Sequence, residues 1–202
     1  MSLPADPHEI YLGFDPGEDE PRAAKHRLVK ELKRAVDDAA LIDPTPAGRD
    51  ELEALADAVA GLPHAALVER SPVSGRSNPI APPLHLEMSE GITRAWAVWS
   101  DAYEGPPGCL HGGFVAAAFD DLMGLAQMAS GKAGYTGTLT VKMIKPTPLF
   151  QRIDYEAWLD RVEGRKIWCK ATARRGDELL GEAEIVFISP ATGVIPGTEA
   201  FH

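Results

Sequence analysis

The chain has 202 residues, of which 45% are hydrophobic and 25% are charged, and this length suits one domain of ordinary size with a short appendage. Its 20 Lys and Arg residues against 30 Asp and Glu residues give a net charge of -10, which excludes the basic footprint typical of nucleic-acid-binding proteins. Two cysteines, Cys109 and Cys169, are too few for a disulfide framework or a four-cysteine metal site.

The beginning of the chain does not have the pattern of a secretion signal. The opening stretch, MSLPADPHEIYLGFDPG, carries acids and prolines where a signal peptide has basic residues followed by an apolar core. No run in the chain approaches the roughly 18 consecutive apolar residues that indicate a membrane-spanning helix. These features predict a soluble, cytoplasmic protein whose partners include neither a membrane nor a nucleic acid.

The first third of the chain predicts two helices and a connector. Residues 1–64 form a predicted N-terminal extension, in which apolar residues at helical spacing indicate one helix over 21–43 and a second over 51–61. Residues 65–83 are rich in proline, serine and glycine, so we expect a connector there. The pattern changes after it, and residues 84–202 are predicted to form the main domain.

The main domain combines strand-like segments with one strong helix. Two segments, 84–88 and 92–99, alternate apolar and polar residues as half-buried strands do, and a Pro/Gly-rich loop then leads to a predicted helix over 111–130. Four further strand-like runs follow, over 136–144, 152–162, 165–175 and 178–188. Tight turns at Gly164 and Gly176 predict that the last three runs form an antiparallel meander. We therefore expect an α+β fold whose antiparallel sheet wraps around the helix.

The predicted helix has one apolar side and one side of small residues. With Val115 as reference and 100° per residue, the positions predicted to be buried fall within about 60° of it. They are Ala118, Phe119, Leu122, Ala126 and Ala129. Asp120 falls on the side of glycines and alanines, which suits close approach by a ligand or a second backbone, and Asp121 falls on the other flank. The alternative is that both aspartates are simply solvated. The pattern also does not show which of the two aspartates would take part in chemistry.

The start of this helix carries His111, Gly112 and Gly113. Glycines leave the backbone N–H groups at the positive end of a helix open to a partner. Such an end binds anions, or stabilises a carbonyl oxygen that gains negative charge during a reaction. The alternative is that the paired glycines only allow a tight entry from loop to helix.

Two stretches of the chain together resemble a known enzyme family. They are residues 103–121, YEGPPGCLHGGFVAAAFDD, and residues 136–149, TGTLTVKMIKPTPL. Both resemble the hotdog-fold thioesterases, and most of all the branch that contains the PaaI-type enzymes and the human THEM-type acyl-CoA thioesterases. The shared features are a His-Gly-Gly triplet, an aspartate nine residues after the histidine, and a strand ending in a basic-Pro-x-Pro-like turn. The likeness extends over about 84–188 and leaves the N-terminal extension outside it.

The resemblance implies hydrolysis of an acyl-CoA to a carboxylic acid and CoA, without a metal or another cofactor. It assigns the amide that polarises the thioester carbonyl to Gly112, and the base or nucleophile to Asp120. A hydroxyl at Thr136 is implied to orient the carboxylate or a water molecule, and His111 to position the loop or contact the thioester. The resemblance further implies substrate contacts at Gly113, Lys145 and Pro146.

The implied chemistry requires two subunits. Gly112 and Asp120 are about 12 Å apart along a helix, so one helix cannot place both groups on one carbonyl carbon. The family solves this with a homodimer of antiparallel helices, and such dimers often pair again into tetramers. Some THEM-type relatives carry an asparagine where this chain has Gly105, so the side chain that would hold water from that loop is missing. Basic residues of the last four strands are candidates for the CoA phosphates, and the pattern singles out none of them.

Two alternatives to a thioesterase follow from the same reasoning. One is an enoyl-CoA hydratase or dehydratase of the hotdog fold, which fits less well because those relatives use a histidine with an acid at different spacing. The other is a non-catalytic hotdog module that binds acyl-CoA. A carboxylate facing an anionic ligand contributes little to binding, and this argues against the second alternative.

Overall fold

The computed structural model describes residues 27–28, 31–32, 71–75, 78, 80–89 and 91–191. Residues 27–28 and 31–32 are helical and fall within the first predicted helix. The second predicted helix lies outside the described residues, as does the greater part of the predicted N-terminal extension. The division of the chain into extension, connector and main domain therefore stays a prediction.

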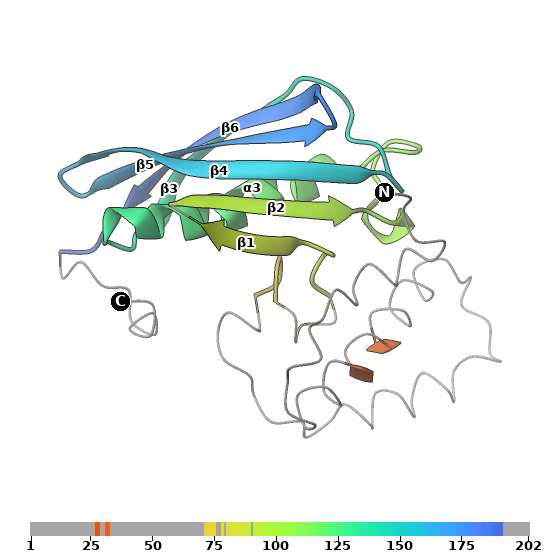
Figure 1. The fold of residues 1–202 in the computed structure, drawn as a ribbon, viewed down its shortest axis with the longest axis horizontal. Coiled ribbons are helices and arrows are strands. Elements are labelled where there is room, and N and C mark those ends of the chain that lie inside the picture. Colours follow the sequence, from red (N-terminus) through yellow and green to blue (C-terminus); the bar gives the residue numbers. More distant parts are fainter. Residues whose placement is uncertain are drawn as a thin grey trace.

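The main domain consists of one antiparallel sheet and one long helix (Figure 1). The strands are β1 (His85–Ser89), β2 (Ile92–Val98), β3 (Tyr135–Met143), β4 (Arg152–Glu163), β5 (Lys166–Arg175) and β6 (Glu178–Ile188), in the spatial order β1-β2-β4-β5-β6-β3. The 3-10 turn η4 (Asp101–Tyr103) precedes the helix α3 (Gly112–Ala126), and a second such turn, η5 (Gln127–Ser130), follows it directly. Figure 1 shows α3 lying along one face of the sheet. The predicted α+β architecture is confirmed.

The predicted meander of the last three strands is also confirmed. β4 pairs with β5, and β5 pairs with β6, both antiparallel. Gly164 and Gly176 lie in the connecting turns with φ of 61° and 57°, a left-handed conformation that glycine adopts without a side-chain clash. The predicted strand ends differ from the observed ones by at most one residue, because alternation stops where the chain turns.

Alternate side chains of the sheet face α3 and form the core with it. Those buried on β4 and β5 are Ile153, Tyr155, Ala157, Ile167, Cys169, Ala171 and Ala173. The residues between them, such as Glu156 and Lys170, belong to the outer face because successive side chains of a strand point to opposite sides. Burial of the inner apolar face against the helix holds the two layers together.

The buried side of α3 agrees with the predicted stripe except at its end. The buried residues that were predicted are Val115, Ala118, Phe119, Leu122 and Ala126. The prediction for Ala129 is wrong, because this residue lies in η5 and is exposed. A 3-10 turn advances about 120° per residue, so the spacing of an α-helix no longer applies there. Met123 is buried as well, although the stripe did not include it.

β3 is an edge strand with one unpaired side. Among the strands that the structure describes, it pairs with β6 alone, and a bulge lies between Thr136 and Thr138. Tyr135 and Met143, at its two ends, are 58% and 54% exposed. Because an edge strand presents a row of unpaired N–H and C=O groups, β3 offers a place where a further strand can pair.

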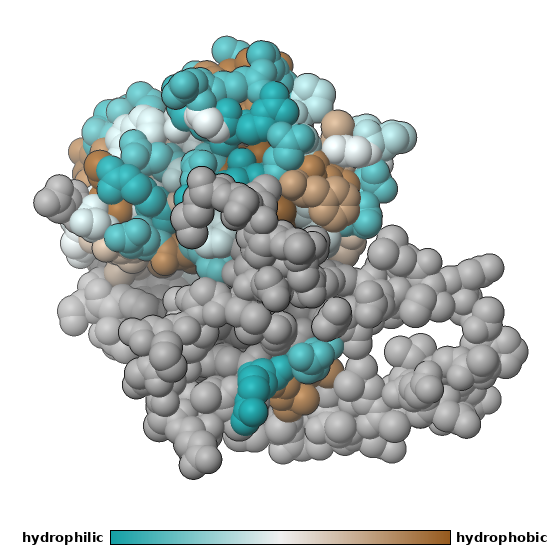
Figure 2. Space-filling model, turned by 45° about the vertical axis from the view of Figure 1, so that its right-hand side comes forward, coloured by the Kyte–Doolittle hydropathy of each residue, from teal (hydrophilic) through white to brown (hydrophobic). Residues whose placement is uncertain are grey.

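The surface of the domain is mixed in polarity. On the face seen in Figure 2, hydrophilic residues predominate and hydrophobic ones are scattered between them. Within the described part of the chain, no helix has the length and apolar character that crossing a bilayer requires. The same residues contain no group of three or more His, Cys, Asp or Glu side chains that could hold a metal ion.

Candidate active site

The loop that leads into α3 is fastened to the turn that follows β3. The Leu110 N–H donates to the Thr147 carbonyl oxygen at 2.8 Å, and the Leu149 N–H donates to the Gly108 carbonyl oxygen at 3.1 Å. Thr147 is buried in this contact region. The two stretches that carry the family resemblance therefore lie together in space, and their contact fixes the first turn of α3.

Gly105 lies where the loop leaves no room for a side chain. A Cβ atom at Gly105 would lie 2.7 Å from the Cα of His111 and 3.1 Å from its Cβ. Carbon atoms do not approach each other this closely without displacement, so any larger residue must push His111 away. The loop as it stands therefore excludes the asparagine that some THEM-type proteins carry at this position.

Gly105→Ala is expected to destabilise the domain by about 1–3 kcal/mol, because the added methyl group displaces the backbone of His111. Calorimetry should show a lower Tm. An unchanged Tm in Gly105→Ala would contradict the close approach of the two segments.

His111 caps α3 with its ring. Its backbone is extended, with φ of -62° and ψ of 135°, and its Nδ1 accepts the N–H of Gly113 at 3.0 Å. Nδ1 therefore carries no proton. The expectation of open amides at both glycines is corrected, because the Gly113 N–H is occupied by this bond. Among the described residues, the Gly112 N–H has no acceptor, so it is the open donor at the positive end of α3.

Asp120 and Thr136 meet between α3 and β3. The Thr136 Oγ1 donates to the Asp120 Oδ1 at 2.9 Å. Asp120 is half-buried and Thr136 is exposed, so the pair lies at the open edge of the sheet. The bulge of β3 comes directly after Thr136, and bulges change the direction of neighbouring side chains. The structure thus brings together two of the residues that the sequence singled out.

Asp121 faces a different part of the chain. Its Oδ1 accepts a hydrogen bond from the Ser71 Oγ at 3.1 Å, which ties the connector to α3. The Ser71 Oγ in turn accepts the N–H groups of Val73 and Ser74, each at 3.2 Å. The pKa of Asp121 is raised above its ordinary value, mainly because the carboxyl group is buried. Hydrogen bonds from the hydroxyls of Ser74 and Ser71 lower this pKa in part, and the charge of Asp120 raises it further. The two neighbouring aspartates therefore have different surroundings, one at the sheet edge and one under the connector.

Asp121→Asn is expected to raise the Tm at pH 7 by about 2–4 °C. Because the pKa of Asp121 is higher in the folded than in the unfolded chain, its ionisation costs folding free energy at neutral pH. This cost disappears as the pH falls below the ordinary aspartate pKa of about 3.9, because Asp121 is then protonated in both the folded and the unfolded chain. Asparagine keeps an oxygen that accepts from Ser71 and carries no charge to bury.

Thermal melts of both proteins between pH 7 and pH 4 check this expectation, and the difference in Tm should shrink on acidification. Asp121→Ala serves as control, since it leaves the Ser71 hydroxyl without its acceptor and should melt below the unaltered protein throughout. A difference in Tm that widens towards pH 4 would contradict the raised pKa.

The start of α3 lies against the end of β3. A Cβ atom at Gly112 would lie 3.1 Å from the Met143 Cε. Asp120 and Thr136 lie near the other end of β3, and Asp120 is about 12 Å from Gly112 along the helix axis. Within one chain, the open amide and the carboxylate are therefore too far apart to act on one atom.

Lys145 and Pro146 lie in the turn after β3. The Lys145 Nζ forms an ion pair with the Glu178 Oε1 at 2.5 Å, and Arg175 binds the other oxygen of the same carboxylate. These hydrogen bonds lower the pKa of Glu178. Pro146 is exposed next to them. In the structure, Lys145 is thus engaged with a carboxylate.

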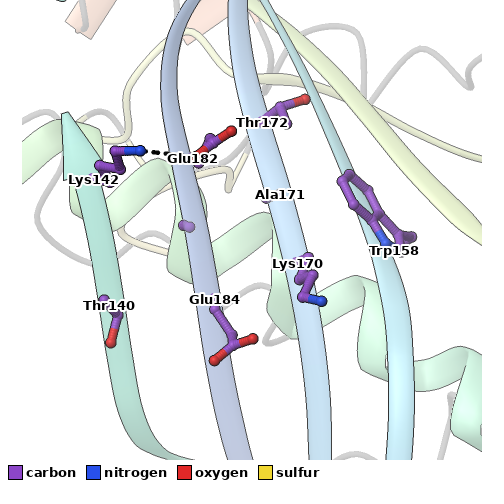
Figure 3. Close-up of a pocket in the computed structure, with 9 residues that line it drawn as sticks. Thr140, Lys142, Trp158, Lys170, Ala171, Thr172, Glu182 and Glu184 are labelled. Atoms are coloured by element: carbon purple, nitrogen blue, oxygen red, sulfur yellow. Dashed lines mark ion pairs between the residues drawn. The ribbon is translucent and has the colours of Figure 1, made fainter. Parts of the chain in front are cut away.

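A separate hollow of about 350 Å³ lies on the outer face of the sheet, away from α3 (Figure 3). Trp158 and Lys170 line it, together with Lys142 and Glu182, which form an ion pair at 3.7 Å. Apart from Lys142, one of the basic residues considered for the CoA phosphates, none of the residues singled out for chemistry lines this hollow. It is therefore not part of the candidate site.

Comparisons with known proteins find relatives of this chain by sequence and by fold. Over 87 residues, 42% of this chain, the sequence is 36% identical to the acyl-coenzyme A thioesterase THEM4 of Bos taurus. A crystal structure of a thioesterase superfamily protein is 28% identical and superposes with a TM-score of 0.72, over 85% of this chain and 91% of that chain. By sequence and by fold, the chain is therefore similar to proteins of the thioesterase superfamily, and it shares their hotdog fold.

Other comparisons show how far this similarity extends. A Streptococcus mutans protein crystallised with acetyl CoA is 14% identical and superposes with a TM-score of 0.50, over 53% of this chain and 88% of that chain, which shows the hotdog fold alone. No model of a known protein family matches the chain. The matched region spans 35% of the bovine relative's length.

Two contacts in and beside the candidate site were not predicted from the sequence. His111 was expected to position the loop or to contact the thioester, and its role as the cap of α3 was not predicted, since histidine is not among the favoured N-cap residues. The bond from Ser71 to Asp121 joins segments far apart in the chain, and no local pattern reveals it.

Proposed function

We propose that the protein is an acyl-CoA thioesterase of the THEM-type branch that acts as a homodimer, with each active site built from two subunits. The observation that carries the proposal is the bond from Thr136 to Asp120 at an open sheet edge, together with the open Gly112 amide on the same helix. The likeness to the acyl-coenzyme A thioesterase THEM4 supports the reaction. A protein of the same fold crystallised with acetyl CoA supports the substrate class.

The free edge of β3 supports an arrangement of two subunits. In a symmetric antiparallel pairing centred on Leu139, the start of β3 in one subunit lies opposite its end in the partner. Asp120 is held at the start of β3, and Gly112 lies against Met143 at its end. Such a pairing brings Asp120 of one subunit towards Gly112 of the partner subunit, which supplies the contact that one chain cannot make.

Small residues on this side of α3 support the close approach of a second helix. Those that are exposed or half-buried are Gly113, Ala116, Ala117 and Gly124. A Cβ atom at Gly124 would meet nothing within 4 Å, so open space lies beside the helix there. Light scattering measures whether the chain forms the expected dimer and whether dimers pair further into tetramers.

The proposed reaction is the addition of water to the thioester. Asp120 takes a proton from water as the oxygen attacks the carbonyl carbon, and the Gly112 N–H of the partner subunit stabilises the oxyanion by about 3 kcal/mol. Collapse of the tetrahedral intermediate breaks the C–S bond, and the CoA thiolate receives the proton from Asp120. Direct attack by the carboxylate, through an anhydride that water then hydrolyses, gives the same acid and CoA.

The remaining residues position these groups in the proposed reaction. Thr136 donates to the Asp120 carboxylate and fixes its orientation. His111 holds the first turn of α3 through Gly113, so that the Gly112 N–H keeps its direction. Lys145 and Pro146 follow Met143 at the same end of β3, where the CoA arm would pass.

A thiol-release assay over acyl-CoA thioesters of different chain length and type tests the proposal. We expect one free thiol for each carboxylic acid formed, with the acid identified by mass spectrometry. Binding of acyl-CoA without release across the panel would contradict the proposal and favour a non-catalytic module. Addition of water to an enoyl-CoA with the thioester intact would favour the hydratase alternative.

A further inference from the structure

A cluster of polar side chains lies at the end of the sheet where α3 begins. Lys145 follows β3, Arg175 ends β5 and Glu178 begins β6. The Glu178 carboxylate binds both cations, the Lys145 Nζ at 2.5 Å and the Arg175 guanidinium through its other oxygen. The Arg175 Nη1 also donates to the Gln151 Oε1 at 3.1 Å. Figure 1 shows the β5–β6 turn at the same end of the sheet as the segment that enters β4.

Phe150, directly before Gln151, holds an unfavourable backbone conformation. Its φ is 55°, the only positive φ at a non-glycine residue in the described part of the chain. Its N–H donates to the Trp99 carbonyl oxygen at 2.8 Å, which fastens this conformation. The ring is 46% exposed, so burial within the subunit compensates little of the strain. Strain of this kind is concentrated at ligand sites, and here it presents an aromatic ring to solvent.

We propose that Phe150, Lys145 and Arg175 bind the adenosine 3′-phosphate end of CoA. The proposal rests on the proposed function, because it takes an acyl-CoA as the substrate. An exposed aromatic ring stacks on a nucleobase, and Lys and Arg bind phosphate through charge-assisted hydrogen bonds. Because the chain carries a net charge of -10, a phosphate needs such local cations.

The cluster is within reach of the proposed reaction centre. The Met143 Cε lies 3.1 Å from the position of a Cβ atom at Gly112, whose amide is the proposed oxyanion donor. Lys145 is two residues beyond Met143 along the chain, so the Cα atoms of these two residues are at most about 7 Å apart. The pantetheine arm of CoA separates the thioester from the nucleotide, and the proposal directs this arm from Gly112 towards the cluster.

Glu178 holds both cations in the structure. Hydrogen bonds from Lys145 and Arg175 lower the pKa of Glu178, so its carboxylate is ionised at neutral pH. An incoming phosphate must compete with this carboxylate for the two cations. Removing the charge of Glu178 should therefore strengthen phosphate binding, the opposite of removing either cation.

Isothermal titration calorimetry with adenosine 3′,5′-bisphosphate and with AMP tests this subsite without turnover. Arg175→Gln and Lys145→Gln should each weaken binding of the bisphosphate by about tenfold. Phe150→Ala should weaken both nucleotides by about tenfold, and Phe150→Leu, which keeps the bulk without the ring, should do the same. Glu178→Gln should tighten the bisphosphate by about threefold. Thermal melts check that each variant is folded.

Arg161→Gln is the matched control. Arg161 lies near the Gly164 turn and pairs with Asp160 and Glu163, apart from the cluster, so its replacement should leave nucleotide binding unaltered. A bisphosphate affinity that stays unchanged in Arg175→Gln and Phe150→Ala would overturn the proposal. An equal loss of affinity in the control would overturn it as well.

Hydrolysis assays separate this proposal from the proposed function. An acyl-N-acetylcysteamine carries the thioester but no nucleotide. In Arg175→Gln, the ratio of kcat/KM for acyl-CoA to that for acyl-N-acetylcysteamine should fall about tenfold, and an unchanged ratio would overturn the subsite. If the unaltered protein hydrolyses neither substrate but binds the bisphosphate as described, the proposed function is wrong and the nucleotide subsite stands.

Discussion

Asp120→Asn is expected to lower the kcat of acyl-CoA hydrolysis by about 10²–10⁴-fold, the usual contribution of a positioned general base. Asparagine keeps the size of the side chain and an oxygen that accepts from Thr136, but it cannot take a proton from water. Because Asp120 lies at the open sheet edge and outside the core, the fold and the dimer should persist. Circular dichroism and light scattering check this, and thiol release measures the loss of activity.

Asp121→Asn is the matched control for this prediction. It removes the adjacent carboxylate, which is bound to Ser71 and not to Thr136, so its kcat should stay close to that of the unaltered protein. Full activity in Asp120→Asn alongside an inactive Asp121→Asn would transfer the catalytic role to Asp121. Loss of the dimer in Asp120→Asn would instead assign the residue to assembly.

Gly112→Pro is expected to lower kcat by about 10²–10³-fold, because proline has no N–H to offer the oxyanion. Gly112 is the first residue of α3, the helix position that accepts proline best. His111 before it already has the extended backbone that a following proline requires, with ψ of 135°. The substitution removes one donor and is compatible with the helix, but its ring also meets the flexible end of Met143. Gly112→Ala, which meets the same atom and keeps the N–H, is the control and should retain most of the activity. Circular dichroism verifies the helix, and thiol release reports kcat.

Co-expression of Gly112→Pro and Asp120→Asn chains tests the shared site more sharply than either variant alone. In a mixed dimer, one site receives its amide from the second chain and its carboxylate from the first, so it is complete, while the other site lacks both. With random pairing, about a quarter of all sites should be active. If each chain supplied both groups to its own site, the mixture would show no recovery, and the two-subunit arrangement would be wrong.

Local pattern predicted the fold closely, and it failed where the local geometry changed. The strand ends agree with alternation to within one residue. Ala129 was misplaced because the helix tightens into a 3-10 turn after Ala126, a change that spacing does not announce. At the helix start, both glycine amides were expected to be open, and the ring of His111 occupies the one at Gly113. A side chain that folds back onto the backbone is not visible in a residue pattern.

The sequence by itself determined the six strands, the long helix, and the placement of Gly112 and Asp120 on that helix too far apart to share one atom. These follow from alternation and helical spacing, which are properties of neighbouring residues. Only the tertiary structure decided that Asp121 belongs to the connector through Ser71, and that Lys145 and Arg175 share one carboxylate beside Phe150. Such contacts join segments that are far apart in the chain. The strand order places β3 beside β6, and a hydrogen bond holds Ser71 of the connector against α3.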